Sequence, residues 1–212
     1  LFVSLPGGGP ARVLITPRDS SDPRADEMKV IVTGFRADAE ILLEFLARDS
    51  MRAVNALADS VILAEKLLAE KFQDPLAAVA GAYYLLRVNA WNRVPCTWFE
   101  NLSQHFSWLP DAAIVHCIRL LREGNEAQSS PRSTIKLFKQ SLERGWPVYS
   151  EGITLLQEAA ASLRGAFTET EYQPSFNYVQ DLGAAKAWAG AAASFYGRFP
   201  NEPSTLIWAG MP

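Results

Sequence analysis

Residues 74–88 read DPLAAVAGAYYLLRV and carry the clearest helical signal in the chain. Asp74 can cap the free backbone amides of a helix, and Pro75 at the first helical position sacrifices no hydrogen bond. Small residues then make a thin face: Ala77, Ala78, Ala80, Gly81 and Ala82. The segment therefore predicts a helix from Leu76 to Val88.

Comparable helix starts recur at Pro75, Asp111 and Pro147, a constant spacing of 36 residues. Each interval holds two helical patterns and a turn, which is similar to helical-hairpin repeats of the tetratricopeptide (TPR) or Sel1-like type. The full TPR pattern of Trp, Gly, Tyr and Ala positions is not matched. We therefore predict a mainly α fold, a TPR-like helical-hairpin array preceded by two or three short β-strands and a flexible loop.

The remaining elements follow from apolar periodicity and from turn residues. Thr97 and Glu100 form a capping box that predicts a helix over residues 98–106. Other helices are expected from Ala37 onward, after a cap at Ser50, and over residues 111–124, 133–144, 149–164 and 181–196. Residues 168–178 are expected to form a loop, and residues 1–5, 12–16 and 29–33 to form strands.

This pattern divides the chain into three parts. Residues 1–35 are interpreted as the β-rich end of a preceding domain, residues 36–198 as the helical-repeat domain, and residues 199–212 as an extended tail. Residues 17–29 are polar and charged and contain two prolines. Because such a segment buries little apolar surface, we expect an exposed, cleavable loop there.

The composition excludes several classes of protein. The chain is 49% hydrophobic and 20% charged, with a net charge of −3 and no dense Lys/Arg cluster, which argues against direct nucleic-acid binding. No apolar run is long enough to span a membrane, and the first residues lack a basic stretch followed by an apolar core, so we expect neither a membrane span nor a signal peptide. Only two cysteines occur, which fits a reducing compartment, so we expect a cytoplasmic protein. The missing initiator Met indicates that Leu1 is internal to a longer protein.

Candidate metal and thiol chemistry rests on Cys96, His105, His116 and Cys117. Their spacing fits no CxxC motif, and adjacent helical residues point about 100° apart, so buried, unreactive thiols are the favoured interpretation. No GxSxG, HExxH, EF-hand or Walker pattern is present. We expect a protein without catalytic residues, metal or cofactor.

Aromatic residues gather in the middle of the chain. Two interpretations stay open, core packing between helices or a partner-binding surface in which Trp and Arg anchor another protein. The candidate partner-binding residues are Trp91, Trp98, Phe99, Trp108, Arg87 and Arg93.

Glu27-Met28-Lys29 stands in the polar segment ahead of a helical region, and this arrangement resembles the protein substrate of the type III-E CRISPR system. In that antiviral defence system an RNA-guided effector activates a caspase-like TPR-CHAT peptidase, the combined enzyme being called Craspase. The resemblance implies cleavage between Met28 and Lys29, with Asp26, Glu27 and Val30 contacting the protease. It also implies that the helical domain is the docking surface, and that cleavage alters the control of an extracytoplasmic-function sigma factor.

The cleavage hypothesis meets one difficulty and one competing hypothesis. Residues 29–33 have the pattern of a strand, so cleavage would require its first residues to fray or to pair with the protease. The competing hypothesis is a TPR/Sel1-like interaction scaffold with no proteolytic switch, which would tolerate changes at Met28 and Lys29.

Overall fold

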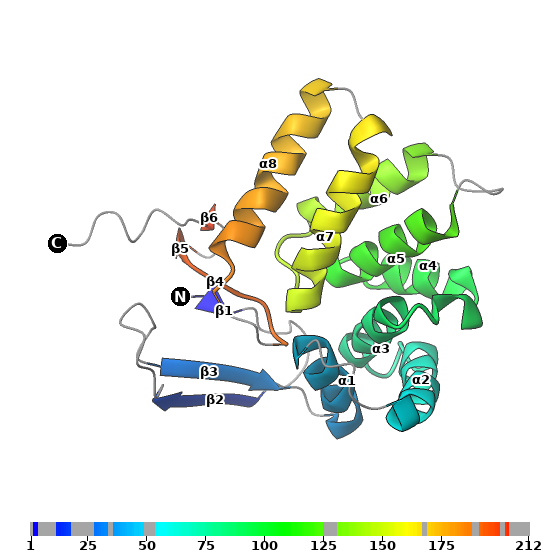
Figure 1. Cartoon of the computed structure of the whole chain (residues 1–212). Helices are drawn as coiled ribbons and strands as arrows, with labels where there is room; N and C mark the ends of the chain where they lie inside the picture. The colour runs from blue at the N-terminus through cyan, green and yellow to red at the C-terminus, as the bar shows by residue number, and fades with distance from the viewer. Residues whose placement is uncertain are drawn as a thin grey trace.

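Helices make up most of the described chain (Figure 1), so the predicted mainly α fold is confirmed. The structure, a computed structural model, describes residues 2–3, 12–17, 28–33, 36–48, 54–124, 131–166, 169–187, 191–199 and 202–203. The α-helices within these residues are α1 (Ala37–Arg48), α2 (Val54–Ala69), α3 (Pro75–Arg87), α4 (Cys96–His105), α5 (Pro110–Glu123), α6 (Pro131–Glu143), α7 (Ser150–Leu163) and α8 (Glu169–Ala185). Short 3₁₀ turns cover Trp91–Arg93 and Arg164–Ala166.

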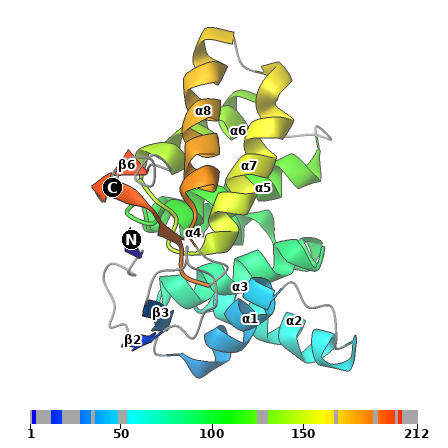
Figure 2. The same ribbon diagram turned by 60° about the vertical axis from the view of Figure 1, so that its left-hand side comes forward.

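The helices form a stacked array around a central row. Helix α5 packs between α3 and α7, while α2 packs on α3, α4 and α6 pack on α5, and α8 packs on α7. The two views in Figures 1 and 2 show this succession of neighbouring helices. The central helices begin at Pro75, Pro110 and Ser150, close to the predicted repeat spacing. The predicted array of helical hairpins is confirmed.

The predicted start and thin face of α3 are also confirmed. The Asp74 carboxylate accepts hydrogen bonds from the backbone amides of Leu76 (3.0 Å) and Ala77 (2.9 Å). Gly81 permits the close approach of α2, because a Cβ there would lie 2.6 Å from the carbonyl oxygen of Ala64. Small side chains thus bring the two helices into direct backbone contact.

The Arg122 side chain contacts residues one repeat length before it and one repeat length after it. Arg122 of α5 donates to the carbonyl oxygen of Leu86 on α3 and to the Glu158 carboxylate on α7, at 3.4 Å. Each partner lies 36 residues from Arg122 in sequence. Equivalent positions of the three central helices therefore face one another across the array.

Short antiparallel strand pairs lie at the two ends of the chain. β2 (Arg12–Pro17) pairs with β3 (Met28–Thr33), β1 (Phe2–Val3) with β4 (Ser194–Phe195), and β5 (Gly197–Phe199) with β6 (Glu202–Pro203). The strands predicted over 12–16 and 29–33 are confirmed, each with one further residue beside the loop. The β1–β4 pair brings the start of the chain against the segment after α8, where the Phe2 and Phe195 rings stack with centroids 5.5 Å apart.

The C-terminal helix was predicted wrongly. Residues 169–178, expected in a loop, belong to α8, and the helix expected over 181–196 ends at Ala185. Pro174 and the polar neighbours obscured the helical pattern, yet Val179 and Leu182 are fully buried against the array. Burial on α7 therefore outweighs a proline near the start of the helix. Within the predicted tail, residues 199 and 202–203 belong to the small β5–β6 pair.

The capping box was also wrong. Helix α4 begins at Cys96 with Pro95 as its N-cap, and no side chain caps it. Thr97 and Glu100 therefore both lie within the helix. The cap predicted at Ser50 falls outside the described residues.

Candidate functional site

The predicted cleavage site lies in a strand. Met28 pairs with Pro17, Lys29 with Thr16, and Val30 with Ile15 in the β2–β3 hairpin. Pro17, Met28 and Lys29 therefore belong to strands and not to the predicted loop over 17–29, whose remaining residues fall outside the described ones. The other predicted contact residues, at positions 26 and 27, fall outside the described residues.

Several predicted partner-binding residues make contacts within the helical array. Phe99 is fully buried, and the Trp91 ring packs 4.2 Å from the Arg119 guanidinium. Two arginines join helices through ion pairs, Arg87 with Glu151 and Arg93 with Glu65. The core-packing interpretation therefore describes Phe99, whereas Arg87 and Arg93 are exposed and their role in partner binding stays a prediction.

A surface cluster surrounds the turn between α2 and α3. Phe72 is 65% exposed, and its ring contacts His105 (5.1 Å between centroids) and Phe106 (5.9 Å). The Lys71 amine lies 5.3 Å from the Trp98 ring and 5.7 Å from the Phe72 ring. We call Lys71, Phe72, Trp98, His105 and Phe106 the aromatic patch.

Sequence reasoning identified part of this patch. It selected Trp98, and also Trp108, which lies outside the patch two residues after Phe106 and is 45% exposed. It missed Phe72 because a single aromatic residue in a turn has no periodic signal. Lys71 is only 6% exposed, and burial lowers the pKa of its amine.

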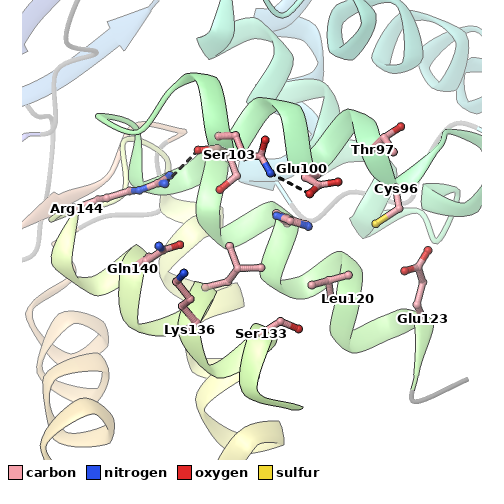
Figure 3. A pocket seen from close by; sticks show the side chains of 13 residues that line it. Cys96, Thr97, Glu100, Ser103, Leu120, Glu123, Ser133, Lys136, Gln140 and Arg144 are labelled. Carbon is pink, nitrogen blue, oxygen red and sulfur yellow. Dashed lines mark hydrogen bonds between the residues drawn. The ribbon is translucent and has the colours of Figure 1, made fainter. Parts of the chain in front are cut away.

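A polar groove lies on the opposite face of α4. It is lined by α4, α5 and α6 and has a volume of about 850 Å³. Figure 3 shows Arg144 and Lys136 of α6 toward one end, and Cys96 and Glu123 at the other. His116 of α5 also lines the groove. A volume of this order falls within the range of sites that bind small molecules.

Comparison with known proteins places the chain in a family. The model of the Y4kD C-terminal domain matches residues 41–209, which is about four fifths of the chain. The chain belongs to the Y4kD C-terminal domain family. The match includes all of α2 to α8 and leaves the β2–β3 hairpin outside.

One curated protein similar to this Y4kD C-terminal domain is a "Probable protease" from a Desulfuromonadales bacterium, 29% identical over 114 residues. The aligned region is 54% of this chain but only 13% of that protein, so the chain corresponds to a small part of it. No solved structure matches. No described helix of the domain is long and apolar enough to cross a membrane.

Neither thiol of the domain is activated for nucleophilic attack. Burial, with Glu123 nearby, raises the pKa of the Cys96 thiol to about 11. Burial alone raises the pKa of Cys117 to about 12, and its Sγ lies 3.7 Å from the Thr134 carbonyl oxygen. A thiolate is the reactive form of cysteine, and these environments disfavour it.

The four residues considered for metal binding meet different surroundings. His105 packs against Phe72, His116 and Cys96 line the groove, and Cys117 is buried beneath α6. Among the residues that the structure describes, no group of three or more His, Cys, Asp or Glu side chains could hold a metal ion.

The one fully buried carboxylate among the described residues, that of Asp111, holds neighbouring helices together. Asp111 of α5 accepts hydrogen bonds from the Tyr83 hydroxyl (2.8 Å) and the backbone amides of Val148 (2.7 Å) and Tyr149 (3.1 Å). Burial raises the pKa of Asp111 to about 6, although these hydrogen bonds oppose the shift. Because its partners are structural, Asp111 fixes α3 and the start of α7 to α5.

Proposed function

We propose that this Y4kD C-terminal domain is a non-enzymatic protein-interaction module that binds its partner through the aromatic patch. The observation that supports this proposal is the exposure of Phe72, at 65%, in ring contact with His105 and Phe106. A large aromatic side chain held in place by its neighbours has little rotamer freedom to lose when another protein covers it. Covering a Phe side chain stabilises a complex by about 1.5–3 kcal/mol.

The buried lysine adds a polar component to the same surface. Lys71 holds its amine beside the Phe72 and Trp98 rings, where burial has already removed part of its hydration. A carboxylate of the partner placed beside this amine would favour its charged form, which burial disfavours. An apolar side chain next to an acidic one would therefore match this patch.

The similar curated protein indicates a biological setting for such a module. That protein is named a probable protease, and the matching region is a small part of its length. We propose that the module selects a protein for a proteolytic system, either as an additional domain of a protease or as a separate regulator. Control of a sigma factor or of a stress response would be one outcome of such selection.

Site-specific crosslinking tests the interaction surface. Benzoylphenylalanine would replace Phe72 in the protein expressed in its native cells, with the exposed Gln180 of α8 as the matched control position. We expect a discrete adduct from position 72 that wild-type protein competes away and the Phe72→Ala variant does not. Identical adducts from positions 72 and 180 would contradict the proposal.

Cleavage between Met28 and Lys29 by an RNA-activated caspase-like TPR-CHAT peptidase is a second proposal. Its support is local: Met28 forms the last pair of an isolated two-stranded hairpin, and its partner Pro17 has no backbone N–H to donate. A hairpin of two strands is marginally stable, so its terminal pair opens at low cost.

The cleavage proposal is tested by incubating the protein with the activated effector and measuring the intact masses of the products. We expect one cut after Met28, lost in the Met28→Gly variant. An uncut, folded chain would contradict cleavage and leave the interaction module as the function.

A further inference from the structure

The polar groove contains an unsatisfied buried nitrogen. His116 is only 9% exposed, and its Nδ1 atom has no hydrogen-bond partner among the described residues. Buried polar atoms in folded proteins are nearly always hydrogen-bonded, so an exception that lines a groove indicates a group that is completed by a ligand.

The same groove is lined by a cation that has no matching anion among the described residues. The Arg144 guanidinium donates to the carbonyl oxygens of Ser103 (3.1 Å) and Leu109 (3.4 Å), and no described carboxylate lies within ion-pair distance of it. Burial, and to a smaller extent the positive charge of Arg144, lowers the pKa of His116 to about 4. Both side chains line the same groove, His116 from α5 and Arg144 from α6.

We propose that the end of the groove formed by His116 and Arg144 binds a carboxylate of a peptide ligand. The carboxylate would accept one hydrogen bond from the guanidinium and one from Nδ1 of His116, filling both open positions. This site is distinct from the aromatic patch, since Trp98 and His105 lie on the side of α4 opposite to Thr97 and Glu100. It does not depend on the proposed interaction through Phe72.

Other charges decide which end of the groove accepts the anion. Lys136 of α6 adds a second positive charge on the same side as Arg144. Glu123 is paired with Arg119 at 2.6 Å, and Glu100 accepts a hydrogen bond from Gln104 at 2.9 Å. These two carboxylates repel an anion from the far end and from the middle of the groove.

Proton uptake is coupled to binding. An anion placed between His116 and Arg144 cancels the repulsion that keeps the imidazole neutral, so the pKa of His116 must rise when the site is filled. By linkage, the carboxylate binds more tightly as the pH falls toward the range in which His116 takes up its proton.

Nuclear magnetic resonance of the two histidines tests the site in the intact chain. The probe is acetyl-glycylglycine, with its C-terminal amide as the uncharged control at the same ionic strength. His105, in the aromatic patch, is the internal reference. We expect the acid to raise the titration midpoint of His116 by about 0.5 pH units or more and leave His105 unchanged, and the amide to shift neither.

Variants connect this response to Arg144. Arg144→Gln is expected to lower the affinity for acetyl-glycylglycine at least about fivefold, and Arg144→Lys to retain part of that affinity. Phe72→Ala is expected to leave the affinity unchanged. A melting curve for each variant verifies that it is folded. Equal responses to acid and amide, or an unchanged response in folded Arg144→Gln, would overturn the proposal. A stronger response to inorganic phosphate than to the acid would overturn the assignment to a carboxylate.

Discussion

The helical body and the β2–β3 hairpin both contain apolar residues, but the body buries them and the hairpin leaves them exposed to solvent. In α3 every residue from Ala77 to Leu86 is buried. In β2 three consecutive residues, Val13, Leu14 and Ile15, are 48%, 55% and 59% exposed. Because successive strand residues point to opposite faces, both faces of β2 are open.

The difference shows that burial comes from partners distant in sequence. Helix α3 contacts α1, α2 and α5, whereas β2 gains its contacts mainly from β3. In Figure 1 the hairpin lies at the edge of the helical body, beside α1. It also precedes the residues that define the family. We expect stability to reside in the body and to be nearly independent of the hairpin.

The largest loss of stability is expected at Asp111, which links α3, α5 and the start of α7. Asp111→Ala removes the acceptor for Tyr83, Val148 and Tyr149 and leaves their buried donors unsatisfied. The loss in free energy of unfolding should be about 3–5 kcal/mol, measured by urea denaturation. The exposed Asp59→Ala is the control and should change stability by less than about 0.5 kcal/mol. Equal effects of the two variants would show that Asp111 does not join the helices.

A slightly smaller loss of stability is expected at the contact between α2 and α3. Gly81→Ala places a Cβ 2.6 Å from the Ala64 carbonyl oxygen and 3.2 Å from Leu67 Cβ, so the helices must separate. We expect a loss of about 2–4 kcal/mol from this overpacking, measured by thermal unfolding. Gly165→Ala is the matched control, because nothing lies within 4 Å of a Cβ there. A stable Gly81→Ala variant would mean that the two helices can move apart freely.

The same comparison explains what the sequence could predict. The Asp74-Pro75 start, the repeat spacing and the two hairpin strands depend on local patterns, and each was found. The part of α8 before residue 179 was missed because its stability comes from packing on α7, which no local pattern reports.

The site was less predictable than the fold for a related reason. Phe72 joins the aromatic patch only because α4 places His105 and Phe106 beside it. His116 of α5 and Arg144 of α6 line the same groove, without a shared motif in the sequence. Which aromatic residues become core and which become surface is decided by the helix array.

The pH dependence of the body should reveal two opposing groups. Asp111 has its pKa raised to about 6 in the folded protein from 3.8, so the stability it contributes is lost as the pH rises from about 4 to 6. His116 has its pKa lowered to about 4 from 6.5, so the stability it contributes is lost as the pH falls through the same range. Each amounts to about 2–3 kcal/mol, and together they nearly cancel.

Single variants separate the two contributions. Asp111→Asn should become more stable relative to wild type as the pH rises from 4 to 6, and His116→Gln should become less stable relative to wild type over that range. Urea denaturation at several pH values measures both trends. Parallel curves for wild type and both variants would show that neither buried group titrates in this window.

The smallest effect is expected in the hairpin, where it separates the two regions most clearly. Leu14→Ser alters a side chain that is 55% exposed, so the free energy of unfolding of the body should change by less than about 0.5 kcal/mol. Leu85→Ser, at a fully buried position of α3, should cost at least about 3 kcal/mol in the same urea measurement. Amide hydrogen exchange should show β2 and β3 exchanging much faster than α3 in the wild type, because a two-stranded pair opens without unfolding the array. If Leu14→Ser instead destabilised the body as strongly as Leu85→Ser, the hairpin would be part of the cooperative unit. Met28 would then be protected from a protease by the stability of the whole domain, since its strand could open only when the helices unfold.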